Sequence, residues 1–400
     1  MERSVQNCSA SSQRIILLLA IAGGTAVMNV FFNQPLLVEI ATSFQVSARA
    51  ASSIPTFTQI GFGIGVILFV PLGDMVQRRR LLPIMLACTA CGLLAAATAS
   101  NLLWLSVASL FIGLTTVIHP IVVSFAAQIT APPQRGKAVG TVLSGIFTGI
   151  LLSRTVGGVV AAHFGWRTVY WLAAGLMIVL AVVLSMTLPK SQSAAISYPR
   201  LMRSLPQLFI EQPVLRETVV IGAMQFGGFN AFWTTLAFLL STPPYHYGSE
   251  VAGLFGLVGI VGATAAPLVG RLADQKGPRL TVGLSIIIIA SAYVVFWLLG
   301  YALWGLIAGV ILLDLGVQAG LVSNQARIYT LLPETYNSRL NTVYALFYYL
   351  GGALGSTLGA YNWSLWQWSG VCSIGLLMMV IACATYFGGY KRDSPRQKAN

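Results

Sequence analysis

Three ionisable residues interrupt long apolar stretches of the chain, and they are the first candidates for chemistry. His119, Arg154 and Asp314 each lie well inside such a stretch, whereas the other charged residues gather between the stretches. A charged side chain at the centre of a membrane-spanning helix costs ~2.5–3.5 kcal/mol on insertion scales, so it is a functional candidate by default. The three residues are therefore candidates for binding protons, ions or substrate.

Asp314 lies near the middle of the stretch VILLDLGVQAGLVSNQ and is the only acidic residue so deep. A carboxyl group in a low-dielectric cavity can bind and release a proton near neutral pH, which a proton-coupled carrier requires. Gln318 follows one helical turn later on the same face, and Asn324 and Gln325 come after it. These amides fit a polar stripe along a transport pathway, and they fit hydrogen bonds between helices nearly as well.

Arg154 lies in GILLSRTVGG, in the outer third of a predicted helix that begins near Ala138. It can bind an anion, pair with a carboxylate or move with the proton site. Alternatively, its long side chain can extend to the outer membrane interface at little cost. Both interpretations remain open, because the residue lies close enough to the interface for either.

Two further polar sites have two interpretations each. His119 precedes Pro120, so its imidazole can exchange protons near neutral pH or hydrogen-bond at a helix kink. Asn33 and Gln34 precede Pro35, so their amides can contact substrate or end a helix. Nearby aromatic residues can stack on a hydrophobic ligand or pack against helices and lipid: Phe31, Phe32, Phe229, Phe232 and Trp233.

The composition places the chain in a membrane. Of its 400 residues, 56% are hydrophobic and only 8% are charged, whereas a soluble domain has about a quarter charged. Apolar segments of ~18 or more residues recur, and each is long enough to cross a bilayer as a helix. The predicted spans cover residues 14–37, 50–70, 81–100, 102–126, 138–161, 168–188, 217–241, 250–270, 280–299, 301–325, 342–360 and 367–389.

The net charge of +13 reflects membrane orientation. If the N-terminus is cytoplasmic, 20 of the 23 basic residues, Arg327 among them, fall in cytoplasmic segments, and only Arg49 and Arg167 fall outside. This asymmetry is the positive-inside pattern of multi-pass membrane proteins. We therefore expect cytoplasmic N- and C-termini, the inner membrane of a bacterium, and no nucleic-acid partner.

The sequence indicates no cofactor and no metal. Cys88 and Cys91 form a CxxC pattern within a predicted span, where a small buried role is favoured over zinc or redox chemistry. The ATP-binding pattern GxxxxGK[ST] does not occur, so transport must be driven by an ion gradient or by the substrate gradient. A proton gradient is the expected energy source.

The chain repeats itself around a polar, basic linker. The predicted domains are an N-terminal bundle (1–188), a cytoplasmic linker (189–216) with a short helix at 199–210, and a C-terminal bundle with a short tail (217–400). Asp74 and Asp274 are 200 residues apart, and glycine stripes recur farther on at an offset of 202. Small residues let helices approach closely, and the proposed packing glycines are Gly145, Gly149, Gly157, Gly158, Gly351, Gly355 and Gly359.

The loops PLGDMVQRRR (71–80) and GRLADQKGPR (270–279) carry a family resemblance. They resemble the repeated loop motif of major facilitator superfamily transporters, and the resemblance covers nearly the whole chain. It implies an all-α membrane protein with twelve transmembrane helices in two pseudo-symmetric six-helix bundles. It also implies a conformational latch formed by Asp74, Arg78, Arg79, Gly270, Asp274, Gly277 and Arg279. An aspartate beside a helix N-terminus there would contribute roughly 0.3–1 kcal/mol.

Two stretches resemble the drug:proton antiporter-like branch of that superfamily: NVFFNQPLL (29–37) and AFWTTLAFLL (231–240). Gly157 and Gly158 match the end of a glycine-rich antiporter motif, but Ser153 and Arg154 depart from it. The resemblance implies an antiporter that couples efflux to protons, and the departures put proton coupling in question. The expected repeat counterpart of Arg154 is Ser356.

The sequence therefore predicts a secondary active transporter that works by alternating access. The leading interpretation is proton-coupled export of a small amphipathic or drug-like compound by a functional monomer. The alternative is an importer or facilitator of a small, anionic metabolite. A membrane-embedded enzyme or sensor is the remote alternative, because the sequence has no HExxH motif, no convincing Ser/His/Asp set and no appended soluble domain.

Overall fold

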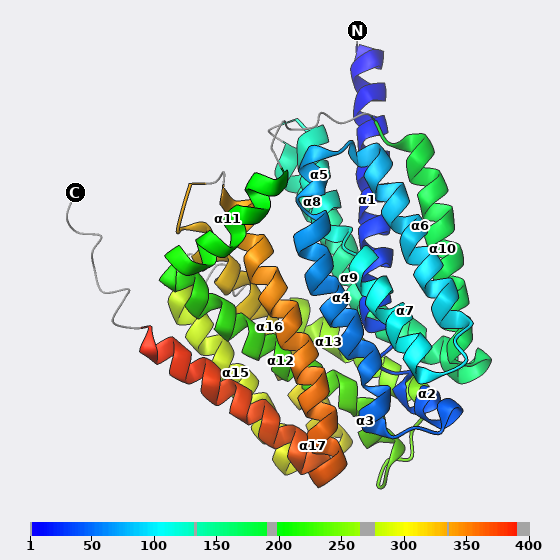
Figure 1. The fold of residues 1–400 in the computed structure, drawn as a ribbon, viewed down its shortest axis with the longest axis vertical. Helices are drawn as coiled ribbons and strands as arrows, with labels where there is room; N and C mark the ends of the chain where they lie inside the picture. Colours follow the sequence, from blue (N-terminus) through cyan, green and yellow to red (C-terminus); the bar gives the residue numbers. More distant parts are fainter. Residues whose placement is uncertain (1, 132–133, 190–197, 265–276, 334–335, 390–400) are drawn as a thin grey trace, which may run out of the picture.

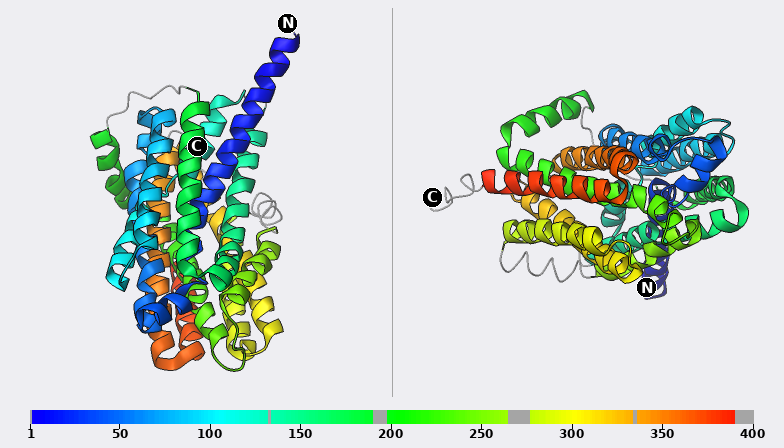
Figure 2. Two further views of the ribbon diagram at one scale, coloured as in Figure 1. Left: turned by 90° about the vertical axis from the view of Figure 1, so that its right-hand side faces the viewer. Right: turned by 90° about the horizontal axis from the view of Figure 1, so that it is seen from below.

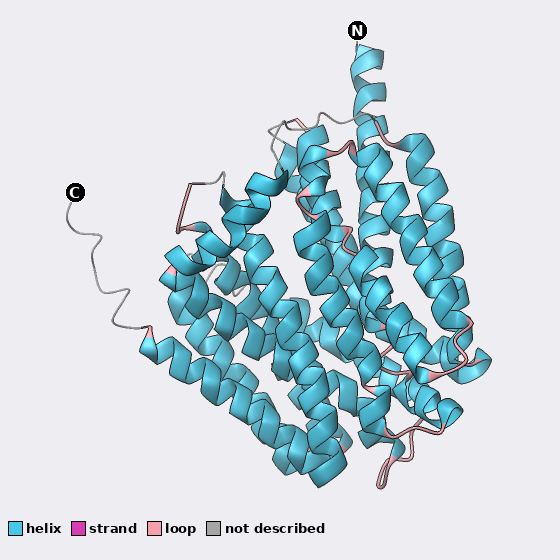
Figure 3. Ribbon diagram, viewed as in Figure 1, coloured by secondary structure: helices cyan, strands magenta, loops and turns pink. Residues whose placement is uncertain are grey.

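A computed structural model describes residues 2–131, 134–189, 198–264, 277–333 and 336–389 (Figure 1). The side chains of residues 2–12, 74, 200 and 260–264 are not described. Within the described ranges the chain is helical and contains no strand (Figure 3). Nine of these helices are long and apolar enough to cross a membrane.

The first six predicted spans correspond to helices α1–α10. Their bounds are α1 (Glu2–Phe31), α4 (Ser53–Phe69), α6 (Arg78–Ala97), α7 (Leu102–Thr115) continued by α8 (His119–Ile129), α9 (Arg135–Phe164) and α10 (Trp166–Thr187). The short helices α2 (Leu37–Phe44), α3 (Ala48–Ala51) and α5 (Leu72–Met75) lie in the connections. We call α1–α10 the N-terminal helices.

The remaining spans correspond to α12 (Pro213–Ser241), α13 (Ser249–Thr264), α15 (Pro278–Leu299), α16 (Leu303–Tyr329) and α17 (Asn337–Gly388). We call α12–α17 the C-terminal helices. The backbone of α17 leaves helical geometry at Trp366 and Gln367, so its 52 residues form two spans. With these two, the described helices account for all twelve spans, which confirms the predicted fold class. In the linker, α11 (Tyr198–Glu211) confirms the predicted short helix.

Helix α12 is the central helix of the C-terminal set. It is 29 residues long but is not among the nine apolar helices, because it carries Gln225, Asn230 and Thr234 in its middle turns. These three side chains are buried, as are nearly all their neighbours on the helix. Since the surrounding helices shield α12 from lipid, it can carry polar groups that a lipid-facing helix could not.

Glycines bring two helix pairs into backbone contact. A Cβ atom on Gly149 of α9 would overlap the carbonyl oxygen of Gly24 in α1, and a Cβ on Gly355 of α17 would overlap that of Gly227 in α12. Similarly, Gly145 and Gly351 face the carbonyl oxygens of Ala20 and Ala223. Gly157 and Gly359 extend the two stripes toward Phe32 and Ala231. The N-terminal and C-terminal helices therefore use the same kind of crossing.

These contacts do not fix the register of the repeat. Small residues recur every four positions along both helices, so matching Gly149 with Gly351 and matching Gly149 with Gly355 both pair similar contacts. Helices α9 and α17 begin at Arg135 and Asn337, which matches the offset that pairs Gly149 with Gly351 and Arg154 with Ser356. In either register the counterpart of Arg154 carries no charge.

We predict that Gly355→Ala destabilises the fold whereas Gly140→Ala does not. Overpacking a tight helix contact costs ~1–3 kcal/mol, and the methyl group at position 355 would meet the backbone of Gly227. Gly140 has open space around its Cα, so alanine there gains helix propensity without a clash. Thermal unfolding in detergent should give a lower midpoint for Gly355→Ala only. Equal midpoints would show that the α12–α17 crossing tolerates a wider spacing.

Candidate functional site

Arg154 lies in the interior of the helix bundle, with 1% of its surface exposed. Its guanidinium carbon is 3.9 Å from the ring centroid of Trp233, 5.2 Å from that of Phe31 and 5.3 Å from that of Phe229. Within the described residues no acidic side chain forms an ion pair with it, and its Nη2 atom has no hydrogen-bond partner. The aromatic faces stabilise the cation but do not neutralise it.

A chain of hydrogen bonds leads from Arg154 to the C-terminal helices. Arg154 Nε donates to Gln34 Oε1 at 2.8 Å, and Gln34 Nε2 donates to Asn230 Oδ1 at 3.4 Å. Asn230 Nδ2 donates to the carbonyl oxygen of Phe226 at 3.0 Å, and Gln59 Nε2 donates to Asn230 Oδ1 at 3.1 Å. A guanidinium can only donate and a carbonyl can only accept, so the orientation of every amide between them is fixed.

The sequence analysis missed Gln59 and Asn230. Gln59 is the single amide of its span, Asn230 shares its span with Gln225, and no local pattern links either Gln59 or Asn230 to Arg154 or Gln34. The available signal was the amide itself, since a polar side chain at mid-span needs a partner in a medium without water. Asn33, by contrast, donates to Thr58 Oγ1 at 3.2 Å, one residue away from Gln59 on α4.

Asp314 and Gln318 share a cavity of about 80 Å³ between the N-terminal and C-terminal helices. Asp314 is 5% exposed, and its Oδ2 atom has no hydrogen-bond partner. The cavity wall is otherwise aromatic and aliphatic, and its rings belong to Phe31, Phe147, Phe226, Phe229, Tyr348 and Tyr349. Phe31 and Phe229 also contact Arg154, so the guanidinium and this cavity share two aromatic neighbours.

One face of α13 accommodates both central charges. A Cβ on Gly259 would lie 3.1 Å from Asp314 Oδ2, and a Cβ on Gly256 would lie 3.1 Å from the Cβ of Arg154. Because glycine has no side chain, these two positions, one helical turn apart, leave space on α13 for the side chains of Asp314 and Arg154. Arg154 and Asp314 are close enough to attract each other but do not form an ion pair.

The other predicted pathway residues lie apart from these charges. The ring of His119 stacks on Phe62, with centroids 5.4 Å apart, and lines a separate cavity of about 110 Å³ together with Gln325. Gln325 Nε2 donates to Asn341 Oδ1 at 3.2 Å, and Asn324 Nδ2 donates to Gln225 Oε1 at 3.0 Å. Asn324 and Gln325 therefore form hydrogen bonds between helices.

The described latch residues make contacts within their own set of helices. Arg78 Nε donates to the Gly73 carbonyl at 2.7 Å, and Arg79 Nε donates to the Ser185 carbonyl at 3.3 Å. Arg279 Nη2 donates to the Tyr386 carbonyl at 3.0 Å. Gly277 precedes α15 with a φ of +89°, which favours glycine. Gly270 and Asp274 lie outside the described residues, as does the side chain of Asp74, so the latch remains a prediction.

A buried ion pair was not expected from the sequence. Arg327 donates through both terminal nitrogens to Glu217, at 2.9 and 3.0 Å, and both side chains are buried. The predicted span ends at residue 325, whereas α16 continues to Tyr329, so Arg327 lies in its last turn and is buried. Since Glu217 has this partner, Asp314 is the buried acid without one in the described part of the chain.

The N-terminal and C-terminal helices make direct contact at one end of the bundle. Helix α1 projects from the other end, as the left view of Figure 2 shows. At the contact end, Thr56 Oγ1 lies 3.1 Å from Thr357 Oγ1, and Thr155 Oγ1 donates to the Gly253 carbonyl at 2.9 Å. Ser249 Oγ donates to Glu39, and it also lies 3.3 Å from the carbonyl oxygen of Gly158, to which it can donate. A Cβ atom on Gly158 would overlap the backbone of α13. These contacts join the N-terminal and C-terminal helices, and we call this end of the bundle the closed end.

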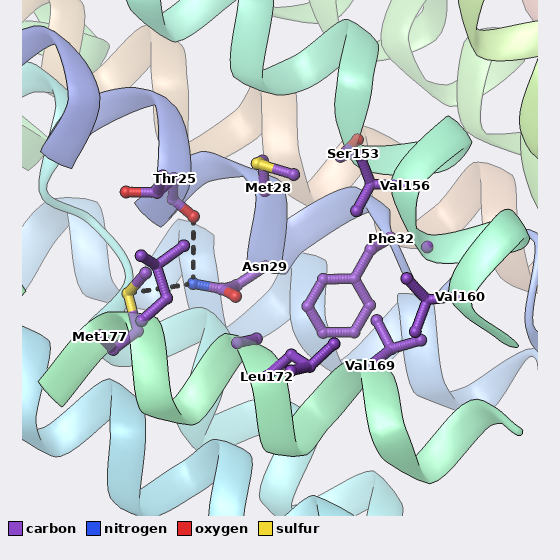
Figure 4. Close-up of a pocket in the computed structure, with 13 residues that line it drawn as sticks. Thr25, Met28, Asn29, Phe32, Ser153, Val156, Val160, Val169, Leu172 and Met177 are labelled. Carbon is purple, nitrogen blue, oxygen red and sulfur yellow. Dashed lines mark hydrogen bonds between the residues drawn. The ribbon is translucent and has the colours of Figure 1, made fainter. Parts of the chain in front are cut away.

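A further cavity of about 110 Å³ lies between α1, α9 and α10 (Figure 4). Ser153 lines it, although the adjacent Arg154 contacts Trp233 of α12. Asn29 is its main polar group and donates to the Thr25 carbonyl at 3.4 Å and to Met177 Sδ at 3.5 Å. Because no charged side chain lines it, this cavity offers no ion-binding group.

Comparison with known sequences indicates a transporter family. Residues 19–356 match the family model described as Major Facilitator Superfamily. The chain is 38% identical to the transporter YgaY of Escherichia coli O157:H7 over 96% of its own length and 97% of that protein. It is 32% identical to the transporter SCO4007 of Streptomyces coelicolor, covering 95% of this chain and 89% of that one.

Solved structures share the fold. A bacterial homologue of the human lysosomal transporter Spinster, in an inward-facing unoccupied conformation, superposes with a TM-score of 0.75 at 16% identity and covers 97% of this chain and 99% of its own. The peptide transporter POT in complex with sulfate superposes with a TM-score of 0.74 at 15% identity, covering 94% of each chain. At these identities the likeness concerns the fold alone.

The closed end can be tested with a cross-link. We predict that Thr56→Cys combined with Thr357→Cys, in a background without the native cysteines, forms a disulfide because the two hydroxyl oxygens are 3.1 Å apart. Oxidation should abolish transport in vesicles and reduction should restore it, since a locked end prevents alternation. The two single variants serve as controls. Full transport by the oxidised double variant would show that this end need not open.

Proposed function

Since the chain belongs to the major facilitator superfamily, we propose that it is a proton-coupled secondary transporter that exports a small amphipathic compound by alternating access. The observation that carries this proposal is the unpaired carboxyl group of Asp314 in a cavity between the N-terminal and C-terminal helices. The protein spans the membrane many times, and both termini are proposed to be cytoplasmic because basic residues gather in that set of loops.

Asp314 is proposed to bind the transported proton. A buried carboxylate without an ion-pair partner is costly, so protonation relieves the cost. The positive charge of Arg154 acts in the opposite direction, because it attracts the ionised form across the glycine face of α13. Small changes in the distance between these groups can therefore release or bind a proton as the helices move.

The hydrogen-bond chain from Arg154 to Asn230 is proposed to change when the bundle alternates. It joins α4 and α9 to α12, so rocking of the two sets of helices must alter it. Each such bond contributes only about 0.5–1.5 kcal/mol net, which a conformational change can exchange for bonds to water or substrate. The contacts at the closed end are of the same modest kind, which suits an end that opens.

A second candidate is the import or facilitated passage of a small anionic metabolite. The buried guanidinium of Arg154 favours it, because no described acidic side chain neutralises that charge. Counterflow in proteoliposomes separates the candidates. Exchange that is independent of pH would support a facilitator, and exchange coupled to proton movement would support the antiporter.

We predict that Asp314→Asn uncouples transport from protons. In one-for-one exchange, a pH difference of one unit can sustain a roughly tenfold ratio of substrate concentrations across the membrane. Both the proton ratio and the substrate ratio then correspond to about 1.4 kcal/mol. In proteoliposomes with an entrapped pH dye, the wild type should release protons when a transported compound is added and should accumulate that compound. Asp314→Asn should do neither, although it should still exchange substrate.

Glu250→Gln is the matched control, because Glu250 is exposed and lies away from the cavity. It should accumulate the compound as the wild type does. Gradient-driven accumulation by Asp314→Asn at the wild-type level would remove Asp314 as the coupling site.

A further inference from the structure

Four unpaired polar atoms lie in one buried cluster at the boundary between the N-terminal and C-terminal helices. We call this cluster the polar junction, and it consists of Asn33, Gln34, Gln59, Arg154, Asn230 and Trp233. The unpaired atoms are Asn33 Oδ1, Gln59 Oε1, Arg154 Nη2 and Trp233 Nε1. Folded proteins leave few buried polar atoms without a partner, so such a concentration points to a missing binding partner.

The two unpaired donors indicate one chemical group of the ligand that would bind at the polar junction. Arg154 Nη2 carries positive charge, and the guanidinium carbon lies 3.9 Å from the ring centroid of Trp233, so the two unpaired donors belong to neighbouring side chains. Trp233 Nε1 can only donate. A carboxylate accepts from both groups, and its planar shape matches the guanidinium. It would also neutralise a charge that no described acidic residue neutralises.

The two unpaired acceptors indicate a second chemical group of that ligand. Asn230 must present its Oδ1 atom to Gln59, because its Nδ2 atom donates to the Phe226 carbonyl. Gln59 therefore uses its nitrogen on Asn230 and leaves Oε1 free to accept. Asn33 Oδ1 is free in the same way, since its Nδ2 atom donates to Thr58. A hydroxyl or ammonium group on the ligand would satisfy these oxygens.

The neighbouring cavity limits the apolar part of the ligand. Phe31 and Phe229 contact Arg154 and also line the cavity of about 80 Å³. A cavity of roughly 150 Å³ is needed to hold benzene, so this one suits a short aliphatic side chain better than fused rings. Building on the proposed transport function, we infer that the substrate is a small hydroxy- or amino-carboxylate with a short apolar side chain, its carboxylate bound by Arg154 and Trp233.

The inference is tested by binding to the purified protein in detergent, without a gradient. The probes are 2-hydroxyisocaproate, leucine, isocaproate and 2-hydroxyisocaproamide, each up to about 10 mM, which detects even millimolar affinity. The hydroxy-carboxylate or leucine should raise the thermal midpoint. Isocaproate should bind about tenfold more weakly, equivalent to 1.4 kcal/mol, and the amide should not bind.

Variants assign the contacts. Arg154→Gln should abolish the response to carboxylates, and Trp233→Phe, which removes only the N–H donor and part of the ring, should weaken it about tenfold. Gln59→Leu should remove the preference for 2-hydroxyisocaproate over isocaproate. Trp297→Phe is the control, because Trp297 is 45% exposed on the outer surface of α15 and should leave binding unchanged.

Three results would overturn the inference: equal stabilisation by the amide and the acid, an undiminished response of Arg154→Gln, or no response of the wild type to any carboxylate. The last result would mean that only water satisfies the polar junction. These outcomes are independent of Asp314. Carboxylate binding without proton coupling would leave the inference standing and reject the proposed antiport, and coupled transport without carboxylate preference would do the reverse.

Discussion

The buried guanidinium of Arg154 is the interaction on which the centre of this protein depends. A cation in a medium without water must be surrounded by groups that stabilise it, and here these groups come from both sets of helices. Trp233 and Phe229 of α12 supply aromatic faces, while Gln34 supplies an acceptor oxygen. Because Arg154 only donates, it also fixes the orientation of Gln34 and, through it, the orientation of the amide of Asn230.

This arrangement requires helices that approach more closely than large side chains would allow. Gly149 and its neighbours bring α1 against α9, which places Gln34 beside Arg154. Gly256 and Gly259 then let α13 pass next to both Arg154 and Asp314. The same small residues that pack the bundle therefore create the space in which two opposite charges lie near each other without pairing.

Polarity is distributed according to distance from lipid. Helix α12, which carries Asn230 and Gln225, has too low a hydropathy to count among the nine apolar helices, yet it is the most enclosed helix of its set. Glu217 near its start is neutralised by Arg327, whereas Asp314 in α16 has no such partner. The structure thus distinguishes a buried acid that has an ion-pair partner from a buried acid that has none among the described residues.

The sequence by itself determined the membrane class, the twelve-helix fold, the linker helix and the positions of Arg154 and Asp314 inside their spans, because hydropathy, charge placement and repeats are local or periodic signals. Only the tertiary structure brought Gln59 and Asn230 into the hydrogen-bond chain of Arg154 and paired Glu217 with Arg327. These features depend on side chains up to 196 residues apart, as for Gln34 and Asn230. Spacing along one helix says which face a side chain occupies, but helix packing decides what that face meets.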